Sequence, residues 1–156
     1  MENVMTEPPW LNVAEVELVY KSKVKASERP QISHSKATAD LLRNLWDQDK
    51  IDFVEQFNIL LLNQANRVLG IVNISTGGVT GTVADPKLIF VAALKANAQG
   101  IIIAHNHPSG NTTPSYADQA LTQKIKSAAQ LLDIRLLDHI IVTSEGYYSF
   151  ADEGLL

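Results

Sequence analysis

Two histidines, a serine and an aspartate are spaced in this sequence as a metal site would require. His105 and His107 stand two residues apart, and Ser115 and Asp118 complete the pattern H-x-H-x₇-S-x₂-D. Side chains at positions i and i+2 of a strand point the same way, so both imidazoles can face one point. Two nitrogens and one carboxylate oxygen suit Zn²⁺ and leave a fourth position open for water, as in catalytic zinc sites. We therefore expect one zinc ion per chain.

Each half of this pattern also has a purely structural explanation. Ser115 and Asp118 fit an acidic variant of the capping box that begins many helices. The two histidines fit polar residues at a turn formed by Pro108 and Gly110. Both halves together, at the carboxyl end of an apolar strand where α/β proteins bind ligands, favour a functional site.

A zinc-bound water requires a base that takes its proton and passes it to the leaving group. Glu55 is the candidate because it begins a strongly apolar strand, EQFNILLLN, where a carboxylate otherwise costs free energy. A solvent-exposed strand end explains Glu55 equally well, and Asp52 is a competing carboxylate close by in the sequence. The sequence leaves these alternatives open.

The segment from residue 55 to 156 alternates strands and helices around these side chains. A helix in DPKLIFVAALKANAQG is indicated by Asp85 as N-cap, by the proline after it and by Gly100 just past its end. The apolar run IIIAH that follows is typical of a strand buried on both faces. Ser115 opens a second helix, whose predicted apolar stripe is Ala117, Leu121, Ile125, Ala128 and Leu132. The segments IRLLDHIIVTS and GYYSF end the chain as two short strands. We expect an α/β domain with three layers and a mixed central sheet.

The first 50 residues are expected to add a strand and a helix, so that residues 1–156 form a single domain. The alternation in VAEVELVYKSKV predicts a half-buried strand. Its last alternate positions are three lysines, Lys21, Lys23 and Lys25. Aligned lysines favour an exposed edge strand, although they could also contact phosphate. Helical spacing then runs from Lys36 to about Asp47, after a cap at Ser33 or Ser35.

The composition excludes several classes of protein. The chain has no cysteine, so disulfides, thiolate zinc sites and cysteine nucleophiles are excluded, as is a zinc nucleobase deaminase with its P-C-x-x-C motif. The net charge of −4 supplies no overall basic field, so we expect no tight binding of nucleic acid or membrane. The apolar runs are too short to span a bilayer and the N-terminus lacks a signal pattern, which predicts a cytoplasmic protein.

The residues quoted above resemble a known family. The pattern of Glu55, the two histidines, Ser115 and Asp118 resembles the JAMM (MPN-plus) signature of zinc-dependent isopeptidases and related metalloproteases. The longer strings HNHPSGNTTPSYAD, LLDHIIV and GYYSFADEG resemble the RadC branch specifically. The resemblance runs from about Glu55 to Leu156, and GTVADPKLIFVAALKANAQGIIIAHNHPSG matches the RadC layout of helix, strand and site.

This resemblance implies a cytidine-deaminase-like α/β/α fold that binds one zinc ion. It implies that the zinc ligands are His105, His107 and Asp118. It further implies Glu55 as the general acid/base and Ser115 as the group that helps to polarise the scissile carbonyl of a peptide or protein-conjugate substrate. The RadC name also carries a DNA-repair label, although nothing in the motif reads DNA.

Two departures from the family pattern affect these expectations. Long RadC proteins resemble this chain only in their C-terminal half, and their helical N-terminal region, of a kind associated with DNA binding, has no counterpart in these 156 residues. Where the family usually shows Pro-Arg-Glu before the central helix, this chain has Pro86-Lys87-Leu88. We therefore expect the metal chemistry rather than functions that need the missing region. His139, in the segment LLDHIIV, is expected to be a hydrogen-bonded core residue with no assigned role.

Three functions compete at this point. The first is a zinc hydrolase that cleaves a peptide or isopeptide bond. The second is a non-catalytic binding module of the same fold, which the complete set of expected ligands argues against. The third is a DNA-repair-associated protein that acts by binding nucleic acid or protein, supported by the family label and the lysines at 21, 23 and 25.

Overall fold

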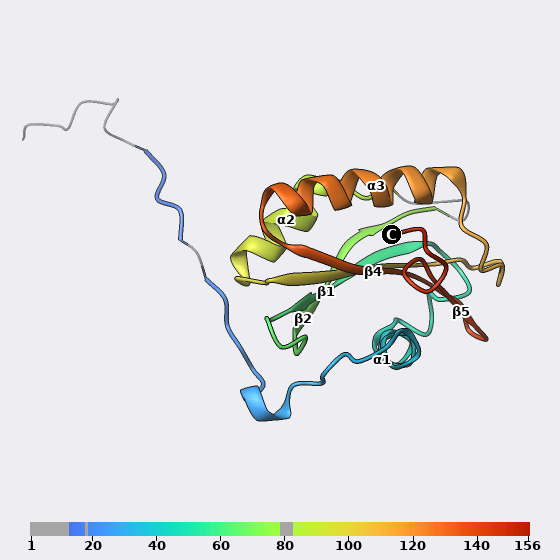
Figure 1. Cartoon of the computed structure of the whole chain (residues 1–156), viewed down its shortest axis with the longest axis horizontal. Coiled ribbons are helices and arrows are strands. Elements are labelled where there is room, and N and C mark those ends of the chain that lie inside the picture. The colour runs from blue at the N-terminus through green and yellow to red at the C-terminus, as the bar shows by residue number, and fades with distance from the viewer. Residues whose placement is uncertain (1–12, 18, 79–82) are drawn as a thin grey trace, which may run out of the picture.

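The computed structural model describes residues 13–17, 19–78 and 83–156, and its centre is one five-stranded sheet (Figure 1). Its strands are β1 (Gln56–Leu62), β2 (Val68–Thr76), β3 (Gly100–Asn106), β4 (Arg135–Val142) and β5 (Tyr147–Ser149). Its helices are α1 (Ser35–Leu45), α2 (Pro86–Lys95) and α3 (Tyr116–Leu131), after a short 3₁₀ turn at Ala26–Glu28. Within the described residues, no helix combines the length and apolar character needed to cross a membrane.

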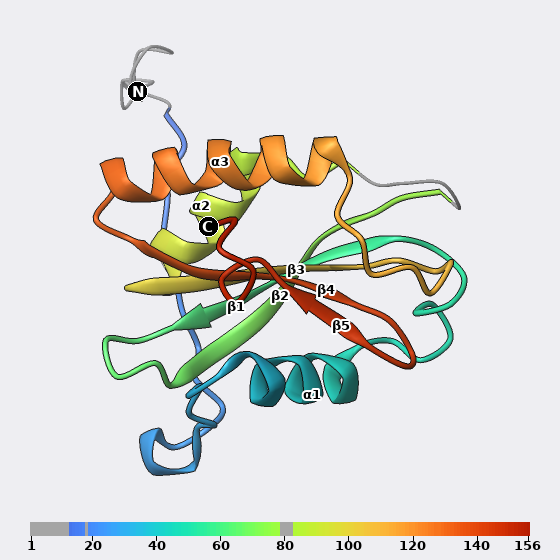
Figure 2. The same cartoon turned by 45° about the vertical axis from the view of Figure 1, so that its right-hand side comes forward.

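The sheet is mixed, with strand order β2-β1-β3-β4-β5. The central pair β3 and β4 runs parallel, and every other neighbouring pair runs antiparallel. Helix α1 covers one face of the sheet, and α2 and α3 cover the other (Figure 2). The three-layer α/β fold with a mixed central sheet, predicted from the sequence, is therefore confirmed.

Burial on both faces explains why β3 reads as a continuous apolar run. Ile101 and Ile103 pack into the core under α2 and α3, whereas Ile102 packs into the core above α1. Successive side chains of a strand alternate between faces, so the alternation carries on into the polar end of β3. His105 consequently lies on the α3 side of the sheet, and Asn106 lies on the α1 side.

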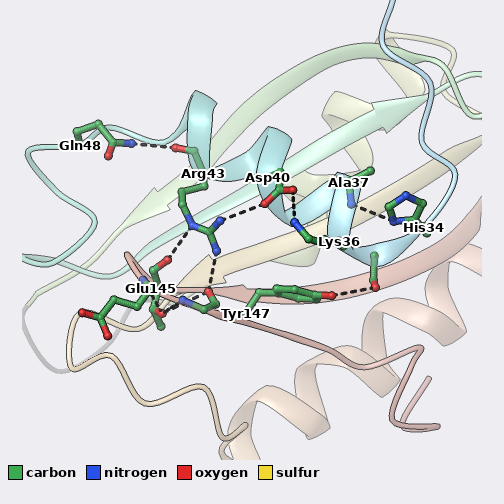
Figure 3. A network of polar contacts seen from close by, with 11 residues as sticks. His34, Lys36, Ala37, Asp40, Arg43, Gln48, Glu145 and Tyr147 are labelled. Atoms are coloured by element: carbon green, nitrogen blue, oxygen red, sulfur yellow. Dashed lines mark hydrogen bonds and ion pairs between the residues drawn. The ribbon is translucent and has the colours of Figure 1, made fainter.

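Helix α1 is fixed to the turn between β4 and β5 by Arg43 (Figure 3). The Arg43 guanidinium donates to the Thr143 and Gly146 carbonyl oxygens, each at 3.2 Å, and to the Asp40 carboxylate at 3.2 Å. The helix begins at His34, whose Nδ1 accepts from the Ala37 amide at 3.1 Å, so the cap expected at Ser33 or Ser35 is wrong. An imidazole nitrogen can take the capping role because it accepts a hydrogen bond as a hydroxyl oxygen does.

The strand expected around residues 13–24 is not found in the described part of the chain. Residues 13–17 and 19–25 lie outside the sheet, with Val13 and Val16 more than 80% exposed at 81% and 83%; Leu18 lies outside the described residues. The Tyr20 hydroxyl donates to the Leu69 carbonyl at 2.8 Å, so a side chain rather than a backbone ladder meets strand β2. Alternation predicts a strand only where a sheet edge accepts its backbone, and the described residues of this segment form no backbone ladder with the sheet.

The end of α2 also differs from the expectation. Asp85 caps the helix as predicted, with its carboxylate accepting from the Lys87 amide at 2.9 Å. The helix ends at Lys95, and Asn97 takes the left-handed conformation with φ of 51°, where the sequence suggested that Gly100 ends the helix. Asparagine tolerates this conformation better than most residues, and Gly100 instead begins β3.

Candidate metal centre

The two histidines lie at the carboxyl end of β3, in the middle of the sheet. His105 is the penultimate residue of the strand and is 1% exposed, and the Phe57 ring of β1 stacks on its imidazole. The His107 amide donates to the Val142 carbonyl at 3.1 Å, which extends the contact with β4 one residue past the strand. The Nε2 atoms of the two histidines lie 3.0 Å apart, so the two rings face one point as the spacing predicted.

Asp118 reaches the same point from the first turn of α3. Its Oδ1 lies 3.3 Å from Nε2 of His105, and its Oδ2 lies 3.8 Å from Nε2 of His107. The Oδ2 atom also accepts from the amide and the hydroxyl of Ser115, at 2.6 and 2.7 Å, while the Ser115 oxygen accepts from the Asp118 amide at 3.1 Å. The capping box is therefore formed, and it leaves Oδ1 directed at His105. The Asp118 carboxylate therefore completes the capping box and also lies beside the two histidines, as a metal site would require.

The three side chains form a group that could hold a metal ion, because their ligand-type atoms all lie within 4.8 Å of one another. Nδ1 of His107 is 2.6 Å from the Asn111 carbonyl oxygen. A carbonyl only accepts, so this nitrogen carries the proton and Nε2 of the neutral ring has a free lone pair. A lone pair that faces another imidazole and a carboxylate favours a cation between them.

The charge state of Asp118 suits the same purpose. Burial alone would raise the pKa of Asp118, but a proton on Nε2 of the adjacent His105 and the hydrogen bonds from Ser115 outweigh burial and hold the pKa below its usual range. The carboxyl group is therefore ionised at neutral pH, which is the form that binds a metal.

Glu55 lies just before β1, which begins at Gln56 rather than at Glu55. Phe57 pairs with His105 in the antiparallel register of β1 and β3, so continuing that register would bring Glu55 opposite His107. Alternation then places Glu55 on the same face as Phe57, toward the histidines. Glu55 is half-buried, whereas Asp52 is exposed in the turn before it. The geometry thus favours Glu55 over Asp52, and its role as a base stays a prediction.

Asn106, the residue between the two histidines, was not singled out from the sequence. Its fully buried amide donates to the carbonyl oxygens of Ile51 and Val54, at 2.7 and 2.9 Å, and accepts from the Gln56 amide at 2.7 Å. These bonds attach the turn that leads into Glu55 to the strand that carries the histidines. The signal in the sequence was a polar residue at a fully buried strand position.

His139 is a buried, hydrogen-bonded core residue, as expected, but it also contacts the candidate ligands. It lies on β4 with no exposed surface, and its ring stacks on the Phe150 ring with centroids 4.4 Å apart. Its Nε2 is 2.8 Å from Nδ1 of His105, and its Nδ1 is 2.6 Å from the Thr122 hydroxyl. Burial lowers the pKa of His139 well below its usual value, which leaves the ring neutral.

Thr122 was missed because the apolar stripe predicted for α3 is rotated from the buried face. The buried residues of α3 are Thr122, Ile125 and Ala129, whereas Ala117 and Leu132 of the predicted stripe are exposed. A threonine four residues after the aspartate lies on the same helix face, and this spacing was the available signal.

Together, a mixed sheet between helical layers and a cluster of two histidines and one aspartate that could hold a metal ion are features of the JAB class of domains. The RadC-like JAB domain family matches residues 32–155, and the chain belongs to that family.

Several curated relatives are similar over the site-bearing part of the chain. A UPF0758 protein of Flavobacterium johnsoniae is 48% identical over 101 residues, 65% of this chain and 44% of the relative. One of Porphyromonas gingivalis is 50% identical over 103 residues, covering 65% and 45% of the two chains. UPF0758 protein YfjY of Escherichia coli is 46% identical over 102 residues, covering 65% and 64%. The matched part thus spans about half to two thirds of these relatives, whose names state no activity.

The contacts of Asn106 predict that its side chain matters for stability. Asn106→Ala leaves two buried carbonyl groups and one buried amide without a partner, and each such group costs about 1–3 kcal/mol. We expect a loss of at least about 2 kcal/mol in the free energy of unfolding, measured by urea denaturation. Asn73→Ala is the control: it also removes three side-chain hydrogen bonds, but Asn73 is exposed, so water can take the place of its amide. Equal losses in the two variants would contradict this account.

Proposed function

We propose that this chain is a zinc-dependent hydrolase of the RadC/JAMM type that cleaves a peptide or isopeptide bond. The convergence of His105, His107 and Asp118 within 4.8 Å at the carboxyl end of β3 carries this proposal. Two imidazoles and one carboxylate form the ligand chemistry of a hydrolytic zinc site, with one position left for water or substrate. A zinc ion bound there would supply a water of lowered pKa and polarise the substrate carbonyl.

Residues around this centre would transfer the proton and polarise the substrate carbonyl. Glu55, half-buried before β1, would take the proton of the attacking water and pass it to the nitrogen that leaves. The hydroxyl of Ser115 would donate to the oxygen of the scissile carbonyl, which requires its present bond to Asp118 Oδ2 to be shared or given up. The amide and hydroxyl of Ser115 both donate to Asp118 Oδ2, which favours the ionised carboxylate.

The metal prediction separates the ligand role of Asp118 from its capping role. Asp118→Asn keeps the size of the side chain and an oxygen that can accept from the Ser115 amide, but it removes the charge. We expect this variant to lose most of its zinc while its helical circular dichroism is retained. Ser115→Ala is the matched control: it breaks the cap and lowers stability by about 0.5–2 kcal/mol, and it should retain the zinc. Full zinc occupancy in Asp118→Asn would refute the assignment.

The prediction for Glu55 is a loss of turnover without a loss of metal. Glu55→Gln keeps the size but cannot take a proton, so turnover should fall about a hundred-fold or more while zinc content stays near that of the unaltered protein. A panel of peptide and isopeptide conjugates supplies the substrate for this assay. Asp52→Asn, in the exposed turn nearby, is the control and should change little. Undiminished hydrolysis by Glu55→Gln would remove this residue from the mechanism.

The alternative, a repair-associated protein that acts by binding nucleic acid, leads to a different expectation. With a net charge of −4 and its basic residues scattered, the chain should bind DNA weakly and with strong salt dependence, with a Kd no tighter than about 1 µM at physiological salt. A filter-binding titration measures this. Nanomolar affinity for a defined DNA structure would favour the alternative over the hydrolase.

A further inference from the structure

A chain of hydrogen bonds runs behind the candidate metal centre and returns to it. It begins at Nδ1 of His105, 2.8 Å from Nε2 of His139, and continues from Nδ1 of His139 to the Thr122 hydroxyl at 2.6 Å. It ends where that hydroxyl donates to the backbone carbonyl of Asp118 at 2.6 Å. These hydrogen bonds therefore join β3, β4 and α3. They begin at His105 and end at Asp118, which are two of the three candidate ligands.

The direction of every bond in this chain follows from its last acceptor. The Asp118 carbonyl can only accept, so Thr122 spends its one hydroxyl hydrogen there and its oxygen must accept from Nδ1–H of His139. A neutral imidazole with its proton on Nδ1 has its lone pair on Nε2. That lone pair accepts from Nδ1–H of His105, so the hydrogen bonds fix a proton on Nδ1 of His105 and make Nε2 the nitrogen that is available to a metal ion.

The neutral form of His139 is imposed by its surroundings. The ring has no exposed surface and lies against Phe150, at 4.4 Å, and Phe57, at 6.0 Å between centroids. An apolar, buried position of this kind strongly disfavours a charged imidazolium. The neutral His139 ring therefore has one donor nitrogen and one acceptor nitrogen. Its hydrogen bond to Thr122 makes Nδ1 the donor.

We propose that His139 and Thr122 are positioning residues that hold His105 in the Nδ1–H tautomer and so aim the lone pair of Nε2 at the point shared with His107 and Asp118. The use of this arrangement rests on the proposed zinc function, but the proton on Nδ1 of His105 is already fixed by hydrogen bonds in the metal-free chain. His107 reaches the same state by a simpler route, a direct bond from Nδ1 to the Asn111 carbonyl. His105 is buried in the sheet, and the side chains of His139 and Thr122 do for its Nδ1 what the Asn111 carbonyl does for Nδ1 of His107.

Thr122 offers a matched pair of variants that tests this. Thr122→Val keeps the shape but removes the acceptor for Nδ1–H of His139, so His139 can move its proton to Nε2 and force His105 into the wrong tautomer. The zinc dissociation constant, measured by competition with a chelator, should rise about 10–100-fold, as is usual when the partner of a ligand histidine is lost. Thr122→Ser keeps the hydroxyl and should restore affinity to within a few-fold. Ile125→Val, one turn along the same buried face, controls for a loss of packing.

Long-range ¹H–¹⁵N spectra of the metal-free protein show which ring nitrogen of His105 carries a proton. We expect His105 with its proton on Nδ1 in the unaltered protein and in Thr122→Ser, and a shift toward Nε2–H in Thr122→Val. The spectrum of the unaltered protein decides the matter even if Thr122→Val does not fold: a His105 ring with its proton on Nε2 and none on Nδ1 would overturn the proposal. Unchanged zinc affinity in a folded Thr122→Val would overturn it as well. The expected tautomer in a protein that binds no zinc would instead refute the proposed function and leave the positioning role standing.

Discussion

A polar side chain buried at the centre of a sheet has to find its hydrogen-bonding partners inside the protein, and His105 shows what this constraint produces. Only 1% of its surface is exposed, so neither ring nitrogen can rely on bulk water. On one side His139 satisfies Nδ1; on the other, Nε2 faces His107 and Asp118. Helix α3 lies over this face of the sheet and brings Asp118, in its first turn, within 3.3 Å of Nε2 of His105.

Much of the local structure serves two purposes at once. The capping box that begins α3 occupies Oδ2 of Asp118 and leaves Oδ1 for His105. Thr122 bonds the carbonyl four residues before it, an ordinary contact within a helix, and thereby orients His139. Asn106 uses its buried amide to attach the turn before Glu55 to β3. In each case a hydrogen bond that stabilises the fold also fixes a side chain of the candidate site. Few residues therefore contribute to the site without also contributing to the fold.

The fold could be predicted from the sequence wherever apolar periodicity and capping residues coincide. The continuous run of β3, the Asp85 cap of α2 and the Ser115 cap of α3 all carried their own local signals. The strand expected at residues 13–24 failed because alternation says nothing about whether a sheet edge is available. The prediction that Gly100 ends α2 was wrong, because Asn97 takes the left-handed conformation that follows the end of the helix.

The candidate ligands could be proposed from spacing because His105 and His107 share a strand face and Asp118 begins the next helix. The roles of His139 and Thr122 behind these ligands could not be predicted, because their partners are distant in the sequence. His139 meets His105 across 34 residues through the parallel pairing of β3 and β4, and no local pattern shows which buried histidine lies beside which. Thr122 is a polar residue outside the predicted apolar stripe of its helix, although burial makes it part of the core.

The central claim is that the atoms gathered at the end of β3 form a zinc site. X-ray absorption at the zinc edge of the loaded protein tests it most directly, because the spectrum reports the ligands themselves and not their effects. The account predicts two imidazole nitrogens at about 2.0–2.1 Å and oxygen donors at about 2.0–2.2 Å, in four-coordinate geometry. A spectrum with no imidazole scattering, or one of an ion surrounded by oxygen alone, would contradict it.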